Sequence, residues 1–346
     1  MLTRRTFLAS SGAASLLAVP GWAVVGTPAF LAAARETTGK YALFGLDSTG
    51  QITFRVPLPD RGHAAAVHPE RAVAVAFARR PGTFALVLDC TTGAVISRLT
   101  APEGRHFYGH GAFIDGGRVL VTTENDYASG AGRIGLWNAE DGFTRMGEVA
   151  SGGIGPHEVI RLPNGGLAVA NGGLRTHPAT GREKLNIPTM QPNLAYLDGL
   201  RVTETVELDD PKLSIRHIAA RADGAVAMGL QSQRDPDSRV AMLAIHTRGT
   251  PVQTFGHDDA PSFKGYVGSV AWSGDGTRCA VTAPRGGRAV IWTGTQSDIL
   301  HRPDLCGVAP TATGLAFTDG TGAVLTDSGA AKHSVAWDNH LVPVTP

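Results

Sequence analysis

The chain has 346 residues, and its 31 lysines and arginines nearly balance 30 aspartates and glutamates, leaving a net charge of +1. This balance argues against a nucleic-acid partner or a polybasic membrane patch. The 44 glycines and 21 prolines, between short β-branched runs, predict many short strands joined by turns. Three widely spaced cysteines, Cys90, Cys279 and Cys306, do not form a disulfide framework.

Residues 1–23 are expected to be an export signal. Thr3-Arg4-Arg5-Thr6-Phe7-Leu8 matches the twin-arginine signature, an Ala/Ser-rich run follows, and Ala23 suits cleavage. The run is too short and polar for a membrane span, so we expect no stable membrane insertion after cleavage and a periplasmic mature protein. The cleavage position stays open, because residues 29–34 offer later small-residue sites.

Strands are predicted from residue 41 onward. Residues 41–47 and 51–57 flank a Ser48-Thr49-Gly50 turn. From residue 61, six segments align without gaps, and each opens a strand that is followed in most units by a turn, a second strand and a third. The aligned segments are RGHAAAVHP, YGHGAFIDG, GPHEVIRLP, IRHIAARAD, YVGSVAWSG and DLCGVAPTA.

The repeat spacing predicts an all-β fold, a β-propeller of four-stranded antiparallel sheets. The register positions recur about every 49 residues, a period typical of propeller blades. Strands at 41–57 are expected to form the outer part of a further blade that strands near 333–342 complete. We therefore expect seven blades, with six as the alternative, and these domain limits: a signal at 1–23, a linker at 24–39 and one propeller at 40–346.

The hairpin from Gly109 to Asp126 illustrates the repeat. Gly116-Gly117 suits the tight turn, because glycine adopts positive φ. If the first strand begins at His110, the hairpin brings Glu124 and Asp126 to the same edge as that histidine.

The aligned register position collects metal-ligating residue types. In a propeller the first strand of each blade lines the central channel, so these side chains are expected to converge at one mouth. Imidazole and thiolate suit iron, copper and zinc, which predicts a metal site. The register residues are His63, His110, His157, His217, Gly268 and Cys306.

The ends of the second strands add polar residues around the same mouth, as ligands or as groups that orient the histidines. His177 lies on an inserted segment, 175–192, that could close over it. Glu158 is expected to point away from His157 by strand alternation. Glu124 and Asp126 are predicted as metal ligands, and the predicted supporting residues or further ligands are Arg79, Arg80, Asn171, His177, Gln231 and Arg285.

Two structural alternatives stay open. The Gly-His pairs at His63 and His110 resemble the structural Gly-His of WD-type repeats, where the histidine ties a loop. The arginines at 79, 80 and 285 suit either an anion site or salt bridges between blades. The motifs of nucleotide binding, attached haem and classical hydrolases are absent from the sequence.

The chain resembles a bacterial family, domain of unknown function 1513, from about residue 40 to residue 342. The resemblance implies a twin-arginine-exported periplasmic propeller, commonly encoded beside imelysin-like and di-haem proteins of iron acquisition; it supplies no catalytic residue. The motifs that carry it include GRHFYGHGAF, TTENDY, SGGIGPHE, LSIRHIA, PRGGR and WDNHL.

These observations favour a periplasmic propeller that binds a metal or a metal-bearing partner as an accessory to iron acquisition. Iron or copper is the candidate cofactor, and imelysin-like or di-haem proteins are the candidate partners. A metal-dependent oxidoreductase, or another propeller enzyme such as a lyase or lactonase, is the first alternative. A protein-interaction scaffold without metal is the second.

Overall fold

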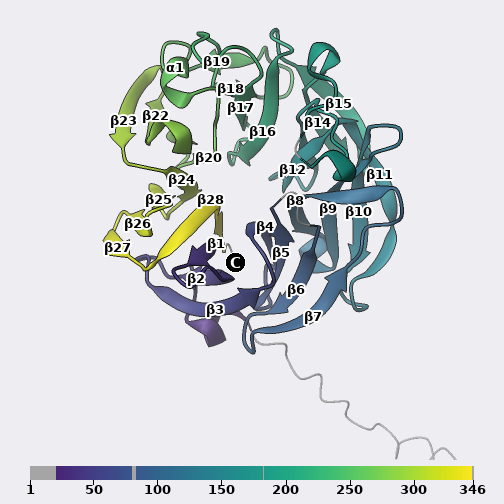
Figure 1. Ribbon diagram of the computed structural model, residues 1–346, viewed down its shortest axis with the longest axis vertical. Coiled ribbons are helices and arrows are strands. Elements are labelled where there is room, and N and C mark those ends of the chain that lie inside the picture. The colour runs from purple at the N-terminus through teal and green to yellow at the C-terminus, as the bar shows by residue number, and fades with distance from the viewer. Residues whose placement is uncertain (1–20, 80–82, 182, 345–346) are drawn as a thin grey trace, which may run out of the picture.

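The computed structural model describes residues 21–79, 83–181 and 183–344. Seven four-stranded antiparallel sheets stand in a ring around a central axis, as Figure 1 shows. The fold is therefore the seven-bladed β-propeller predicted from the repeat, and the six-bladed alternative is excluded. The expected signal at 1–23 lies almost wholly outside the described residues.

In six blades, the strand nearest the axis is the first strand of the blade in the sequence. In the seventh blade, the C-terminal strand of the chain lies nearest the axis (Figure 1). The innermost strands are β4 (Gly62–Val67), β8 (Arg105–Ile114), β12 (Pro156–Arg161), β16 (Leu213–Ala220), β20 (Ser269–Trp272), β24 (Leu305–Pro310) and β28 (Val335–Pro343).

Three further strands complete each blade toward the outside. The second strands are β5 (Val73–Ala78), β9 (Val119–Asp126), β13 (Leu167–Asn171), β17 (Val226–Ser232), β21 (Arg278–Ala283), β25 (Leu315–Asp319) and β1 (Phe30–Glu36). The third are β6 (Ala85–Asp89), β10 (Ala131–Asn138), β14 (Asn193–Asp198), β18 (Leu243–His246), β22 (Arg288–Thr293), β26 (Ala323–Thr326) and β2 (Tyr41–Leu46). The outermost are β7 (Ala94–Leu99), β11 (Thr144–Ile154), β15 (Arg201–Glu207), β19 (Gln253–Phe255), β23 (Gln296–His301), β27 (Gly329–Lys332) and β3 (Ile52–Leu58).

Helical segments are short in the described part of the chain. The α-helix α1 (Ala260–Phe263) is a single turn, and none of the described helices has the length and apolar character needed to cross a membrane. The 3₁₀ turns are η1 (Trp22–Val25), η2 (Asp115–Gly117), η3 (Pro178–Thr180), η4 (Ile187–Thr189) and η5 (Pro284–Gly286).

The ring is closed by strands from both ends of the chain. β28 pairs with β1, in the order β28-β1-β2-β3, with Ala32 opposite Leu341 and Ala34 opposite Trp337. Residues 24–39 are therefore not the linker expected from the sequence, because Phe30–Glu36 forms a buried strand of the propeller. Its alanine-rich composition suits close packing between strands as well as it suits a cleavage region.

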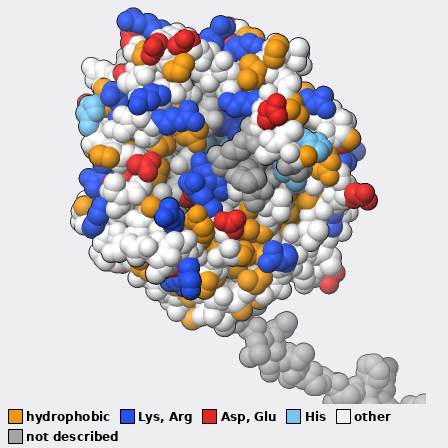
Figure 2. All heavy atoms as spheres, viewed as in Figure 1, with side chains coloured by type: hydrophobic (Ala, Val, Ile, Leu, Met, Phe, Trp, Pro, Cys, Tyr) orange, Lys and Arg blue, Asp and Glu red, His pale blue; other side chains and the backbone are white. Residues whose placement is uncertain are grey.

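The core lies between blades, and the middle strands supply both of its faces. All six residues of β5 are buried, so the strand is a continuous apolar run. Ala74 and Ala76 pack in one cluster with Leu43, whereas Val75 and Phe77 pack in another with Leu120. Strand alternation thus directs successive side chains to opposite neighbouring blades, and each blade buries the next. On the face seen in Figure 2, basic, acidic and hydrophobic side chains are interspersed.

Candidate functional site

A backbone irregularity recurs where the sequence register places its histidines. In the pairing of β8 with β9, the register shifts between Phe107 and Gly111, which leaves His110 inside a bulge. The shift in β12 lies between Pro156 and Glu158, around His157. β20 pairs with β21 without such a shift. A bulge re-aims the side chain it carries. Further shifts lie at Gly62/Ala65, Ile215/His217, Leu305/Gly307 and in β28 between the partners of Ala32 and Ala34.

Five imidazoles meet on the axis. Ring centroids lie 4.4 Å apart for His63 and His340, and 4.8 Å apart both for His110 and His157 and for His157 and His217. Each of the five residues is less than 9% exposed, so the histidines form a closed cluster rather than the open mouth expected. His340, from the C-terminal strand, was not among the predicted residues. We call these five residues the histidine cluster.

The cluster offers two overlapping groups of potential metal ligands. One is His63, His110 and His340, and the other is His110, His157 and His217; within each group the ligand atoms lie within 4.8 Å of one another. His110 Nε2, His157 Nδ1 and His340 Nε2 are buried without a hydrogen-bond partner. A buried nitrogen in that state costs free energy that a ligated cation would recover. The arrangement therefore fits a transition metal.

Glu158 lies beside the cluster, not away from it. Its two carboxylate oxygens are 3.5 Å from Nδ1 of His110 and 3.5 Å from Nδ1 of His217, and one of them accepts a 2.9 Å hydrogen bond from the backbone N–H of Ile218. The expectation from alternation was wrong, because the bulge in β12 falls between Pro156 and Glu158. A carboxylate in this position orients imidazoles for metal binding.

Asp338 plays the corresponding part at His63. Its carboxylate is 3.5 Å from His63 Nδ1 and accepts hydrogen bonds from Arg61 and Arg79. Arg79, a predicted supporting residue, therefore reaches the edge of the cluster through Asp338. Its neighbour Arg80 lies outside the described residues.

Burial sets the protonation of the cluster. Desolvation holds the pKa of His63, His157 and His340 well below its ordinary value and also lowers the pKa of His217. Burial acts to raise the pKa of Glu158, but the imidazoles of His110 and His217 outweigh it and hold that pKa below its usual range. The site thus combines neutral imidazoles at His63, His157, His217 and His340 with an ionised carboxylate, the protonation states that metal ligation requires.

Cys306 occupies its register position but not the cluster. Its thiol is buried and faces the backbone carbonyls of Thr318 at 3.4 Å and Asp338 at 3.3 Å, and neither ligand group includes it. Burial raises the pKa of the thiol, which opposes the thiolate form that binds metal.

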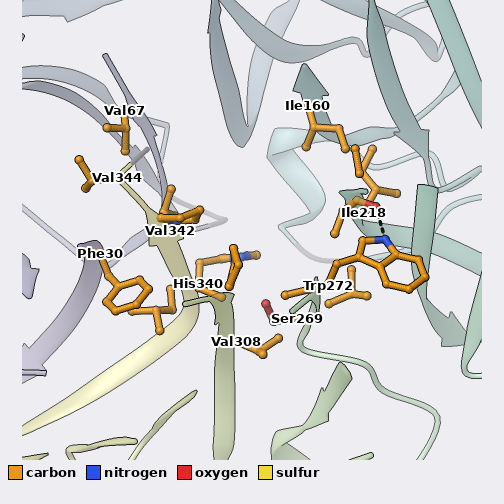
Figure 3. Close-up of a pocket in the computed structure, with 18 of the residues that line it drawn as sticks. Phe30, Val67, Ile160, Ile218, Ser269, Trp272, Val308, His340, Val342 and Val344 are labelled. Atoms are coloured by element: carbon orange, nitrogen blue, oxygen red, sulfur yellow. Dashed lines mark hydrogen bonds between the residues drawn. The ribbon is translucent and has the colours of Figure 1, made fainter. Parts of the chain in front are cut away.

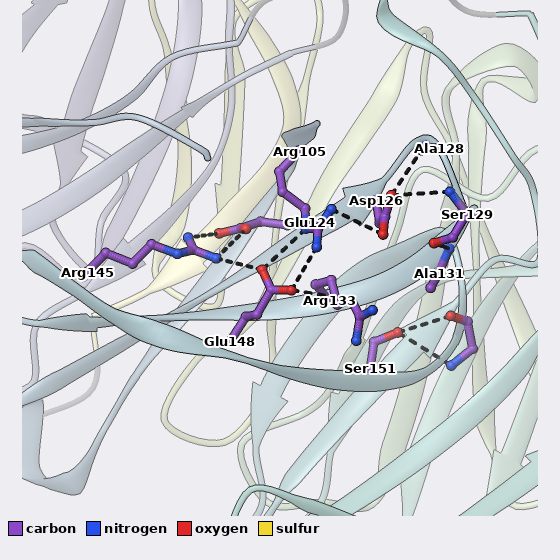
Figure 4. A network of polar contacts seen from close by, with 11 residues as sticks. Arg105, Glu124, Asp126, Ala128, Ser129, Ala131, Arg133, Arg145, Glu148 and Ser151 are labelled. Carbon is purple, nitrogen blue, oxygen red and sulfur yellow. Dashed lines mark hydrogen bonds and ion pairs between the residues drawn. The ribbon is translucent and has the colours of Figure 1, made fainter. Parts of the chain in front are cut away.

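Glu124 and Asp126 lie in a separate ionic network (Figure 4). Glu124 is fully buried and accepts two 2.9 Å hydrogen bonds from Arg145, while Asp126 pairs with Arg105 at 3.1 Å. The expected shared edge with His110 was wrong, because β8 begins at Arg105 and Glu124 lies opposite Phe107.

The other predicted residues belong to neither ligand group and make contacts of their own. Asn171 is hydrogen-bonded to Ser151, Gln231 donates to the Val267 carbonyl at 3.0 Å, and Arg285 lies over the Tyr266 ring at 4.4 Å. His177, on the inserted segment, contacts Tyr127 with ring centroids 4.9 Å apart.

A cavity of about 1120 Å³ follows the axis from the cluster toward the far ends of the innermost strands (Figure 3). His110, Glu158, His217, Ser269 and His340 line its cluster end, and apolar side chains line most of the remainder. The cluster therefore borders this cavity.

We expect the free energy of unfolding of the metal-free protein to fall as the pH drops below about 6.5. Unfolded histidines titrate near that pH, whereas burial lowers the pKa of His63, His157, His217 and His340 in the folded state. The unfolded state then binds more protons, and each of these four histidines contributes up to about 1.4 kcal/mol per pH unit.

Urea unfolding between about pH 8 and about pH 5 measures how the free energy of unfolding depends on pH. A His157→Gln variant should lower this slope by at most about 1.4 kcal/mol per pH unit, the contribution of one proton. The lowered pKa values of Glu158 and Asp338 add stability that is lost, with the same sign, as the pH falls further. An unfolding midpoint independent of pH would contradict the prediction.

A comparison with protein families agrees with the resemblance seen in the sequence. The model described as "Protein of unknown function (DUF1513)" matches residues 56–344. No curated protein matches the chain. The matched range runs from β3 to β28 and includes all seven innermost strands and the histidine cluster. The chain therefore belongs to the DUF1513 family.

Proposed function

We propose that this protein is an exported, metal-binding propeller that holds an iron or copper ion in the histidine cluster as an accessory to iron acquisition. The observation that carries the proposal is the convergence of buried imidazole nitrogens without hydrogen-bond partners on one point of the axis. A histidine that only ties a loop would use its nitrogens in hydrogen bonds, as His246 does with the Tyr196 hydroxyl at 2.7 Å.

The charge at Glu158 supports a cation in the cluster. Among the described residues, Glu158 has two imidazoles and no lysine or arginine within ion-pair distance. Its pKa is lowered, so it is ionised while the imidazole of His217 is largely neutral. The Glu158 side chain is 18% exposed, so its carboxylate is partly desolvated with no cationic side chain of the described chain beside it, which costs free energy. A bound divalent metal ion would offset that cost and occupy the imidazole nitrogens at the same time.

The nitrogen-rich ligand set suits iron, copper and zinc rather than calcium or magnesium. Iron is preferred here because the family setting implies iron acquisition, with imelysin-like or di-haem proteins as partners. Copper stays beside it as a candidate because imidazole ligands suit both metals. Export to the periplasm rests on the twin-arginine signature. Cleavage near Ala23 would keep β1 intact, whereas cleavage between residues 29 and 34 would cut into that strand.

Elemental analysis of protein exported by its native host tests the proposal. We expect about one metal ion per chain in the wild type and a nearly complete loss in a His110/His157 double alanine variant, because these histidines supply ligands to the second group. A His257/His301 double alanine variant removes two exposed histidines and should keep the metal. Metal-free wild type, or equal metal in all three proteins with folded spectra, would refute the site.

A second candidate, a metal-dependent oxidoreductase, is favoured by one observation, the cavity that ends at the cluster. Enzymes place a reactive metal where a substrate can reach it while bulk water is limited. Redox turnover that disappears in the His110/His157 variant would favour the enzyme. A loaded protein that exchanges metal but turns over no substrate would favour the accessory role.

A further inference from the structure

The two ligand groups share a geometric feature that the proposed function does not use. In each group, two of the three histidines line the cavity and the third does not. His110 and His340 line it in the first group, and His110 and His217 in the second, whereas His63 and His157 do not. An ion held by either group would therefore border the cavity.

The walls of the cavity are apolar over most of their length. Figure 3 shows Phe30, Val67, Ile160, Ile218 and Val308 around the space. The wall residue Trp272 has its indole N–H occupied, because it donates to the Ala219 carbonyl at 3.2 Å. Such walls favour apolar molecules and penalise charged ones, which would lose their hydration without recovering it.

Polar groups lie at both ends of the cavity, and Arg161, Arg221, Asp223 and Asp275 line the end away from the cluster. Glu158 and Ser269 line the cavity beside the three histidines. The volume of about 1120 Å³ is slightly above the usual range for small-molecule sites. A pocket with apolar walls and a few convergent polar groups is the usual form of a small-molecule site.

We propose that the cavity binds a neutral, elongated apolar organic molecule with one terminal oxygen or nitrogen donor, and that this donor ligates the metal from the cavity side. The inference rests on the proposed metal site. The apolar body would lie along the walls and the donor would reach the ion beside His110. An anionic head would face the Glu158 carboxylate at short range, and this repulsion disfavours acids.

The full-length mature protein loaded with Co²⁺ tests the inference, with 4-phenylimidazole and imidazole as probes. Calorimetry measures binding, and the visible Co²⁺ spectrum reports coordination. We expect 4-phenylimidazole to bind about 10-fold or more tightly than imidazole, because its phenyl ring leaves water for the apolar walls. Both probes should change the Co²⁺ spectrum.

Two variants narrow the cavity from different blades. Ala112 in β8 and Ala219 in β16 both line it and are partly exposed within it. Ala112→Leu and Ala219→Leu should each weaken 4-phenylimidazole by about 10-fold and leave imidazole and Co²⁺ affinity unchanged. Ala94→Leu, on the exposed outer strand β7, is the matched control and should behave as the wild type.

The outcomes separate the two proposals. If Co²⁺ does not bind, the proposed function fails and the inference fails with it. If Co²⁺ binds but neither probe changes its spectrum, or 4-phenylimidazole binds no more tightly than imidazole, the inference alone is overturned. The inference is also overturned if the two cavity variants bind 4-phenylimidazole as tightly as the Ala94→Leu control does. If Ala112→Leu does not fold, the folded Ala219→Leu protein decides this comparison.

Discussion

Replacing Glu158 by Gln is expected to lower the metal affinity of the histidine cluster by about 10- to 100-fold. The carboxylate oxygens face Nδ1 of His110 and Nδ1 of His217, which favours the tautomer with a proton on Nδ1 and a lone pair on Nε2. An amide N–H in the same place would favour the opposite tautomer and remove negative charge near the ion.

The same change should also lower the stability of the metal-free protein, but only slightly. The pKa of Glu158 is lowered in the folded state, so folding favours the ionised carboxylate over an uncharged group in its place. The introduced amide oxygen can still accept the hydrogen bond from the Ile218 N–H, which limits the loss. A group kept only for stability would show a loss of stability with no effect on metal affinity.

Chelator competition measures the affinity, and urea unfolding of the metal-free protein measures the stability. Glu204→Gln is a matched control, since Glu204 also lies beside a buried histidine, at 3.8 Å from His246 Nε2, but outside the cluster. Unchanged metal affinity in Glu158→Gln would remove Glu158 from the site. A loss of stability together with unchanged metal affinity would assign it a structural role.

Replacing Arg145 by Met is expected to destabilise the protein by about 3–5 kcal/mol. Arg145 makes two 2.9 Å contacts with the carboxylate of Glu124, which is fully buried. Without the guanidinium, that carboxylate keeps only the Thr122 hydroxyl donor at 2.7 Å among its side-chain partners in the described structure. The Arg145 guanidinium carbon lies 5.0 Å from the centroid of the Trp137 ring, and methionine offers that ring an apolar, polarisable contact in its place.

The double variant Glu124→Gln/Arg145→Met should recover most of this loss, because it removes both charges together. Urea unfolding of the single and double variants forms a cycle that isolates the pair. Metal affinity should stay unchanged in both, since neither ligand group includes a residue of this network. A single-variant loss below about 1 kcal/mol would show that Glu124 accepts a proton or reaches water instead.

The local sequence also explains why the Glu124 pair can form inside a blade. Gly135 on the neighbouring strand β10 leaves the space that the carboxylate occupies, since a Cβ there would collide with Glu124 Oε1. From the sequence alone, Glu124 is expected around the channel mouth, as a ligand or as a group that orients the histidines. The identity of the partner, Arg145, depends on the outer strand β11 folding back beside β10.

The fold was predictable because a blade cannot bury both of its faces alone. A repeat of about 49 residues with several short strands admits few solutions, and the aligned register identified six blade starts. The same register placed His63, His110, His157 and His217 on the innermost strands, because the first strand of a blade faces the axis.

The closure of the ring brings the fifth histidine, His340, into the cluster. The sequence predicted that the C-terminal strand completes the N-terminal blade, but only the pairing of β28 with β1 shows that this strand is the innermost one. His340 therefore lies on an innermost strand, as the register histidines of the other blades do. Its motif, WDNHL, was not among the six aligned segments, so sequence similarity did not mark it.

The sequence by itself therefore determined the architecture and four of the five imidazoles, since periodic burial and repeated spacing are local properties of the chain. Only the tertiary structure decided which carboxylates lie beside the histidine cluster. These are Glu158 and Asp338 rather than Glu124 and Asp126. The physical reason lies in the bulges and the ion pairs. One extra residue in a strand reverses the direction of the side chains that follow, and a buried charge lies wherever folding brings it a partner.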